Sequence, residues 1–137
     1  MLKLAKSKFP EIDFKIKDMR KLHFEKNSFD GILVAYSLIH IPKKEVLKIL
    51  KKMASKLNAG GCLYIAVKEK IEGGIDEETK VDNDYGYEYE RFFSYYTITE
   101  LKEYFSNLEL EVIFTENNPP SRSGRASNWI SIIGKKV

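Results

Sequence analysis

The sequence predicts an α/β fold with a mostly parallel sheet that ends in an antiparallel pair of strands. Continuous apolar runs within residues 29–36 and 62–67 are typical of strands covered on both faces, because a strand with one wet face alternates apolar and polar residues. An amphipathic helix over residues 43–57 joins the two runs, so together they predict a βαβ unit with parallel strands. Two later apolar runs, separated only by a loop, predict the antiparallel pair.

The chain before this unit predicts a short helix over residues 1–9 and a strand over residues 12–17. Pro10 ends the helix, because the residue before a proline is pushed out of the helical region. Residues 12–17 alternate apolar and charged side chains, which is typical of a strand with one wetter side near a sheet edge. This strand places Asp18 at its carboxyl end.

The helix over residues 43–57 carries most of its lysines away from its apolar face. We interpret these lysines as a solvated face. A nucleic-acid face is the alternative, but no aromatic residues interleave the lysines as a stacking platform requires. The glycine pair Gly60-Gly61 is expected to end this helix, with glycine in the left-handed conformation of a C-cap.

A second helix and two strands complete the chain. The capping box Thr97-Ile98-Thr99-Glu100 opens a helix that runs to about Asn107. Residues 110–115 and 129–133 predict the closing strands, and the residues 117–125, rich in Asn, Pro and Ser, predict a loop between them.

The connection over residues 69–91 is long for a small α/β domain, and it holds acidic residues followed by tyrosines. Such a connection is typical of a lid or a binding loop. The alternative is a loop whose rings pack onto the body of the protein, because aromatic side chains with a polar tip serve both purposes.

Length and composition fit one soluble domain over residues 1–137, with a small net charge of +3 that by itself requires neither nucleic acid nor a membrane. The single cysteine, Cys62, excludes an intrachain disulfide, and no Cys/His cluster has metal spacing, so no metal is expected. No apolar run approaches the roughly 20 residues of a membrane span. No secretory signal is visible, so a cytoplasmic location is expected.

Three polar residues, Tyr36, Ser37 and His40, follow the apolar run of residues 29–36. Open α/β sheets bind their ligands at the carboxyl ends of central strands, so these residues are candidate site residues. His40 is a candidate base that removes a proton from an acceptor oxygen or nitrogen, although a lone histidine is more often structural.

The ordered set of these features resembles a known family. A strand ends at Asp18, Asn-Ser-Phe-Asp follows at residues 27–30, His-Ile-Pro follows the next strand at residues 40–42, and Leu-Asn-Ala-Gly-Gly follows the helix at residues 57–61. Over nearly the whole chain this order is similar to the later two thirds of class I S-adenosylmethionine-dependent methyltransferases that act on small molecules. The resemblance implies a Rossmann-like sheet and S-adenosylmethionine as cofactor.

The resemblance also implies positions that bind the cofactor. Asp18 matches the acidic residue that accepts a hydrogen bond from the adenine amino group, and the backbone N–H of Met19 matches the one that meets the ring; an Asx turn is the alternative for Asp18. Ala35, Tyr36 and Ser37 match the segment along the methionine end of the cofactor and the substrate entrance.

The methyl acceptor is expected to meet a second group of residues. His40 matches a position that often faces the reaction site in the family. Tyr36, together with Tyr95 or Tyr96 from the aromatic-rich region, is a further candidate for acceptor contacts.

The chain departs from the family pattern before Asp18. No glycine-rich turn and no acidic residue after a second strand are present, as though the N-terminal strands of the family sheet were missing. The strand over residues 29–36 would then have an unpaired apolar edge, which invites pairing. We expect strand 12–17 to move beside it, or a second copy of the chain to complete the sheet as a homodimer.

Two functions follow from these observations. The first is an S-adenosylmethionine-dependent methyltransferase acting on a small molecule. The second is a non-catalytic or partner-completed interaction module that is derived from the same fold and uses its exposed edge or aromatic connection.

Overall fold

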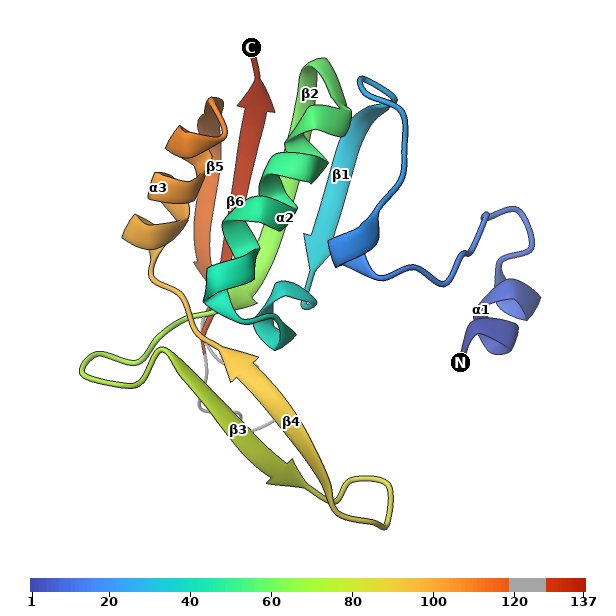
Figure 1. Cartoon of the computed structure of the whole chain (residues 1–137), viewed down its shortest axis with the longest axis vertical. Coiled ribbons are helices and arrows are strands. Elements are labelled where there is room, and N and C mark those ends of the chain that lie inside the picture. Colours follow the sequence, from blue (N-terminus) through green and yellow to red (C-terminus); the bar gives the residue numbers. More distant parts are fainter. Residues whose placement is uncertain (119–127) are drawn as a thin grey trace.

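A computed structural model describes residues 1–118 and 128–137 (Figure 1). The strands are β1 (Phe29–Ala35), β2 (Leu57–Lys68), β3 (Glu77–Asp82), β4 (Tyr89–Ser94), β5 (Leu110–Asn118) and β6 (Trp129–Lys136). The helices are α1 (Leu2–Lys8), α2 (Lys43–Lys56) and α3 (Ile98–Asn107), with short 3₁₀ turns η1 (Met19–Lys21) and η2 (Leu38–His40).

The main sheet is mixed. Within the described residues it has four strands in the order β1-β2-β6-β5, of which β1 and β2 are parallel while β6 runs antiparallel to both β2 and β5. The predicted α/β class and the antiparallel pair at the C-terminus are therefore confirmed. The prediction of a mostly parallel sheet is not confirmed, because β6 returns between β2 and β5 and leaves one parallel pair in this part of the chain.

The core lies between this sheet and the helices α2 and α3, which cover the same face (Figure 1). Leu63, Ile65 and Val67 of β2 are fully buried against it. Leu50 of α2 and Phe105 of α3 are equally buried. Each large apolar side chain buried in this way contributes about 1.5–3 kcal/mol relative to an exposed one. The apolar faces predicted from the helical periodicity of α2 and α3 are therefore the faces that pack against the sheet.

Strand β1 lies at the margin of the sheet rather than at its centre. Among the described residues no strand pairs with its outer edge, and the side chain of Leu33 is 72% exposed. The prediction of a central strand buried on both faces is therefore wrong. An unbroken apolar run reports hydrophobicity, whereas the number of neighbouring strands depends on distant parts of the chain.

Residues 12–17 form no strand, so the prediction of an edge strand there is wrong. Ile12 is 48% exposed and Ile16 is 85% exposed, which means that the alternating pattern has no partner to pack against. The expected repair of the sheet from within the chain therefore does not occur.

The glycines after α2 do not cap it. The helix ends at Lys56, and Leu57, already extended, is its C-cap residue. Gly60 has a positive φ of +80°, but it lies inside β2, close to where the ladder with β1 shifts register between Phe29 and Gly31. The left-handed conformation was predicted at the right pair of residues, but it serves a strand irregularity instead of a helix end.

The N-terminal helix α1 forms where it was predicted, but none of its residues is buried, and it stands apart from the sheet in Figure 1. Helix α3 also forms as predicted, and the Thr97 side chain accepts a hydrogen bond from the Glu100 N–H at 3.1 Å. No helix among residues 1–118 and 128–137 is long and apolar enough to span a membrane. The loop predicted at residues 117–125 falls outside the described residues except for its first two, which end β5.

The predicted loop over residues 69–91 is largely the β3–β4 hairpin, which projects from the body in Figure 1. Its base is tied down: the Lys43 ammonium lies 3.3 Å from Asp76 and 2.9 Å from Glu100, and the Lys43 N–H donates to Glu77 at 2.7 Å. Near its tip, Tyr85, Tyr87 and Tyr89 pack on one another with centroid separations of 5.6–6.3 Å. Tyr85 and Tyr87 are 68% and 64% exposed, so these two rings contact their neighbours in the hairpin and otherwise face solvent.

Candidate active site

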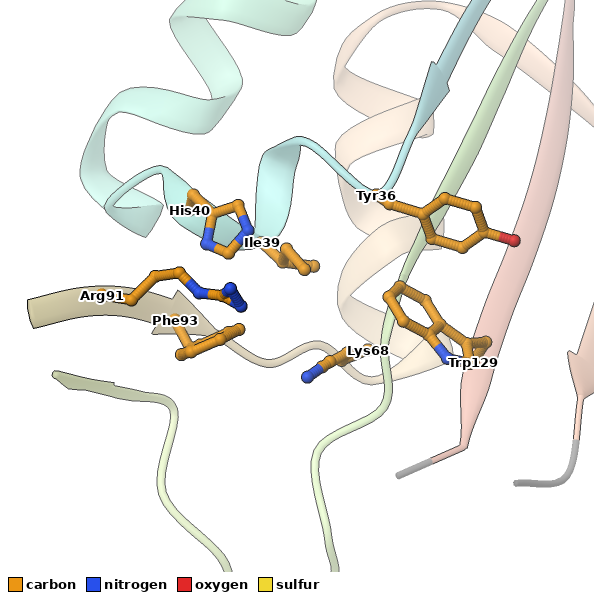
Figure 2. A pocket seen from close by; sticks show the side chains of 7 residues that line it. All are labelled: Tyr36, Ile39, His40, Lys68, Arg91, Phe93 and Trp129. Atoms are coloured by element: carbon orange, nitrogen blue, oxygen red, sulfur yellow. The ribbon is translucent and has the colours of Figure 1, made fainter. Parts of the chain in front are cut away.

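A cavity of about 460 Å³ opens where β1 and β2 end (Figure 2). It is lined by Tyr36, Ile39, His40, Lys68, Arg91, Phe93 and Trp129. Tyr36 follows β1 and Lys68 ends β2, so the cavity lies at the carboxyl ends of the parallel pair, which is where open α/β sheets bind ligands. Strand β4 supplies one wall and the first residue of β6 another.

Tyr36 has a strained backbone at the mouth of this cavity. Its φ is +59°, an uncommon value for a residue with a bulky side chain. Its N–H still donates to the Ala66 carbonyl at 3.1 Å, so the strain begins where the β1–β2 ladder ends. The ring is 57% exposed and meets Trp129 edge to face, with centroids 4.5 Å apart. Strained residues of this kind are concentrated at functional sites.

His40 is held in one tautomer by the backbone of β4. Its Nδ1 lies 2.9 Å from the Phe92 carbonyl oxygen, which only accepts hydrogen bonds, so Nδ1 carries the proton and donates it. In the neutral ring, Nε2 is then the atom with the lone pair. The ring also contacts Phe93, with centroids 5.0 Å apart. The arrangement gives His40 the form that a general base requires.

Two cationic residues that the sequence analysis did not single out, Lys68 and Arg91, also line the cavity. Lys68 Nζ lies 4.5 Å from the centroid of Phe93 and 5.8 Å from that of Trp129. The Arg91 guanidinium lies 5.3 Å from the Phe93 centroid, and its Nε is 3.3 Å from Asp82 Oδ2. Lys68 directly follows the second apolar run, so the carboxyl-end argument used for Tyr36 also points to it. Arg91 ends the connection over residues 69–91, which was expected to be a lid or binding loop or else a loop packed onto the body, but neither Arg91 nor Phe93 was singled out within that region.

A carboxylate fixes the strand ends next to Trp129. Glu69 accepts hydrogen bonds from the side-chain amides of Asn117 and Asn128, both at 3.0 Å, and its N–H donates to the Asn128 carbonyl at 2.9 Å. We call Glu69, Asn117 and Asn128 the Glu69 clamp. It joins the ends of β2, β5 and β6 beside the cavity.

Asp18 and Met19 lie at η1 and do not line this cavity. Asp18 Oδ1 accepts from the Arg20 N–H at 2.9 Å and from Arg20 Nε at 3.0 Å, while Oδ2 is 3.0 Å from Arg20 Nη2. These hydrogen bonds from Arg20 lower the pKa of Asp18 from 3.8 to about 2. Met19 is partly buried against the core. The turn bonds around Asp18 match the Asx alternative, and the carboxylate remains ionised and exposed.

The other residues predicted from the sequence lie at different distances from the cavity: some are next to Tyr36 in the chain, and others lie elsewhere. Ala35 and Ser37 flank Tyr36 and are half-buried. Tyr95 lines a separate cavity and donates a hydrogen bond to Glu78. Tyr96 is fully buried in the core, where burial raises its pKa, and its hydroxyl lies 3.1 Å from Ser94 Oγ. The structure thus brings Tyr36 and His40 together and leaves Tyr95 and Tyr96 outside the cavity.

Comparison with known proteins indicates the protein class to which this fold corresponds. Residues 1–61 match the family model of a methyltransferase domain. The fold is similar to an S-adenosylmethionine-dependent methyltransferase from Methanosarcina mazei, with a TM-score of 0.81 at 19% identity over 99% of this chain and 77% of that one. It is also similar to the Burkholderia thailandensis 1,6-didemethyltoxoflavin-N1-methyltransferase, whose structure holds 1,6-didemethyltoxoflavin and S-adenosylhomocysteine; the TM-score is 0.73 at 17% identity over 98% and 55%.

A third similar structure is the cyclase SpnF, with a TM-score of 0.72 at 14% identity over 98% of this chain and 62% of that one. No curated protein matches the chain. The chain spans between about half and three quarters of the length of these structures. Its fold is that of S-adenosylmethionine-dependent methyltransferases, and the resemblance seen in the sequence is confirmed by this fold and by the family model.

Proposed function

We propose that the protein is an S-adenosylmethionine-dependent methyltransferase that acts on a small molecule. The observation that carries this proposal is the cavity at the carboxyl ends of β1 and β2 in a chain with the methyltransferase fold. Its volume of about 460 Å³ suits a small organic acceptor. A cytoplasmic location is part of the same proposal, and the single cysteine, which can form no intrachain disulfide, supports it.

Residues at the cavity and at the separate turn η1 fit the proposed cofactor. Asp18 is held ionised, and a carboxylate has about four acceptor positions, of which Arg20 uses three, so one stays open to an adenine amino group. Tyr36 presents an exposed ring, and aromatic faces attract cations such as a sulfonium centre. In this proposal Met19 also meets the adenine, while Ala35 and Ser37 line the methionine end.

His40 is proposed to move the proton in the reaction. S-adenosylmethionine, when bound, supplies a methyl group whose carbon–sulfur bond breaks as its bond to an acceptor oxygen or nitrogen forms. His40 Nε2 takes the proton that the acceptor loses, and the Phe92 carbonyl stabilises the resulting imidazolium through Nδ1. The walls around the cavity keep the acceptor oriented toward the methyl group.

Calorimetric titration with S-adenosylmethionine tests the cofactor, and formation of S-adenosylhomocysteine over a panel of small phenols and heteroaromatic amines tests the reaction. Absence of cofactor binding would contradict the proposal. The similar fold of a cyclase makes the second measurement necessary, because one fold hosts several chemistries.

The two histidines of the chain provide a matched pair of variants. His40→Asn is expected to lower kcat by about a hundredfold to ten-thousandfold, because loss of a positioned base has that cost, while cofactor affinity stays the same. His23→Asn, at an exposed position outside the cavity, is the control and should retain the full rate. Equal rates for the two variants would remove His40 from the reaction.

The margin of the sheet favours a second candidate, a partner-completed module in which two copies pair through β1. The outer edge of β1 and the 72% exposed Leu33 form an apolar strand edge of the kind that pairs with other chains. Light scattering after gel filtration should then give a dimer, and Leu33→Lys should give a monomer. A wild-type monomer at all concentrations would exclude the homodimer.

A further inference from the structure

We propose that the cavity selects a planar aromatic or heteroaromatic acid, whose anionic group is held by Lys68 and Arg91. This inference rests on the proposed function, because it names the acceptor class of the same site. It begins with charge: among the described residues that line the cavity, the two ionised side chains are both cationic and none is acidic.

The two cations are held at the same wall. Lys68 Nζ and the Arg91 guanidinium lie 4.5 Å and 5.3 Å from the centroid of the Phe93 ring. Cations stack on aromatic faces, which fixes their position without neutralising their charge. Two positive charges so close to one ring raise the local potential, and an anion that meets both relieves their repulsion.

The hairpin carboxylates Asp82 and Glu78 are not among the described residues that line the cavity. Asp82 meets Arg91 through Nε, and Figure 2 shows the guanidinium end of Arg91 directed between His40 and Phe93. A hydrogen bond from Tyr95 lowers the pKa of Glu78, which also forms an ion pair with Lys80. Glu78 lines a different cavity. Lys80 Nζ also lies near this ring, 5.6 Å from the Phe93 centroid.

The shape of the cavity argues for a flat molecule. Figure 2 shows Tyr36 and Trp129 on one side and His40 and Phe93 on the other, with Lys68 reaching between them. Ring faces pack best against planar groups, and Arg prefers carboxylates through paired hydrogen bonds. His40 Nε2 then has the form to accept a proton from a hydroxyl or N–H carried on the same ring system.

Trp129 is the single tryptophan of the chain and lines the cavity, so its fluorescence reports occupancy without any turnover. The probes are para-hydroxybenzoate and para-hydroxybenzamide, which share a shape and differ in charge. We expect the acid to quench Trp129 with an affinity at least about tenfold above that of the amide, and the preference to shrink at high salt. Equal affinities, or no quenching by either compound, would overturn the proposal.

Variants locate the anion site. Lys68→Met and Arg91→Met should each remove most of the preference for the acid, whereas Lys135→Met, exposed on the same strand as Trp129, should keep it. The carboxylate of the cofactor is the other source of an anion, so S-adenosylhomocysteine is titrated in parallel. Variants that weaken S-adenosylhomocysteine and leave the acid unaffected would overturn the proposal.

The same samples keep the two proposals apart. Calorimetry with S-adenosylmethionine reports the proposed function, whereas the acid-to-amide ratio reports the acceptor class. Cofactor binding with no preference for the acid refutes the acceptor class alone. A preference for the acid with no cofactor binding refutes the methyltransferase and leaves an anion-binding cavity.

Discussion

At two positions in this protein, the property of a single residue depends on one identified neighbour. Asp18 is the clearest case, because one neighbour, Arg20, donates three hydrogen bonds to its carboxylate. Gly134 is a second case, since a Cβ at this position would clash with the ring of Phe105. For each position we predict the effect of one substitution and name a second substitution as its control.

Replacing Arg20 by Gln should return the pKa of Asp18 from about 2 toward 3.8, because the hydrogen bonds and charge of Arg20 lower it. The stabilisation from this pair is present above pH 3.8 and is lost as the pH falls toward 2, since the folded-state pKa is the lower one. Carboxyl shifts followed by NMR measure the change. Lys21→Gln is the control and should move the pKa much less; an unchanged pKa in the Arg20 variant contradicts this account.

Gly134→Ala should destabilise the protein by about 1–3 kcal/mol, because overpacking a well-filled core costs that much. A Cβ there would lie 2.4 Å from a Phe105 ring carbon and 3.0 Å from the Leu110 Cβ. Gly31→Ala in β1 is the control, since its Cβ would meet the Cys62 carbonyl oxygen at 3.9 Å. Urea unfolding compares the two variants, and equal midpoints would refute the close packing.

At the scale of elements, the β3–β4 hairpin depends on its anchors, because it forms a sheet of its own beyond the main one. Lys43 reaches it from the start of α2, and Ser94 Oγ lies 3.2 Å and 3.1 Å from the carbonyls of Leu38 and Ile41. The hairpin supplies Arg91 and Phe93 to the cavity, so its attachment decides whether that wall exists.

Lys43→Met should loosen the hairpin and leave α2 intact. The side chain is 16% exposed and contacts both Asp76 and Glu100, so its loss should cost roughly 1–2 kcal/mol locally and speed hydrogen exchange in β3 and β4 by about tenfold. Lys44→Met, at the next and exposed position, is the control. Unchanged exchange in the Lys43 variant would show that other contacts hold the hairpin.

The elements that could be predicted are those whose signal is local. The periodic apolar face of α2 and the capping box of α3 each specify a helix within a few residues. The positions of Tyr36 and His40 beside this cavity could be predicted, because polar residues that follow an apolar strand lie at the carboxyl edge of a sheet. The positions of Arg91 and Phe93 could not, because they depend on contacts between Lys43 and residues more than 30 positions away.

At the scale of the whole molecule, the sheet is protected unevenly. Helices α2 and α3 cover one face, β2 lies inside between β1 and β6, and β1 has its outer edge open within the described part of the chain (Figure 1). The position of β1 could not be read from its sequence, since the strands beside it are decided by the full topology.

This unevenness should appear in hydrogen exchange. The Tyr36 N–H points to β2, so by alternation the amides of Leu33 and Ala35 point away from it and should exchange much faster than that of Ile65. If two copies pair through β1, these amides become protected as concentration rises. Slow exchange of Leu33 and Ala35 in dilute protein would contradict the open edge.

The Glu69 clamp ties the position of Trp129 to a single carboxylate. The side-chain amides of Asn117 and Asn128 both donate to Glu69, and the Glu69 N–H donates to the Asn128 carbonyl, so the residue before Trp129 is held by two hydrogen bonds. A change at Glu69 should therefore be felt at the indole wall of the cavity, although Glu69 is not among the residues that line it.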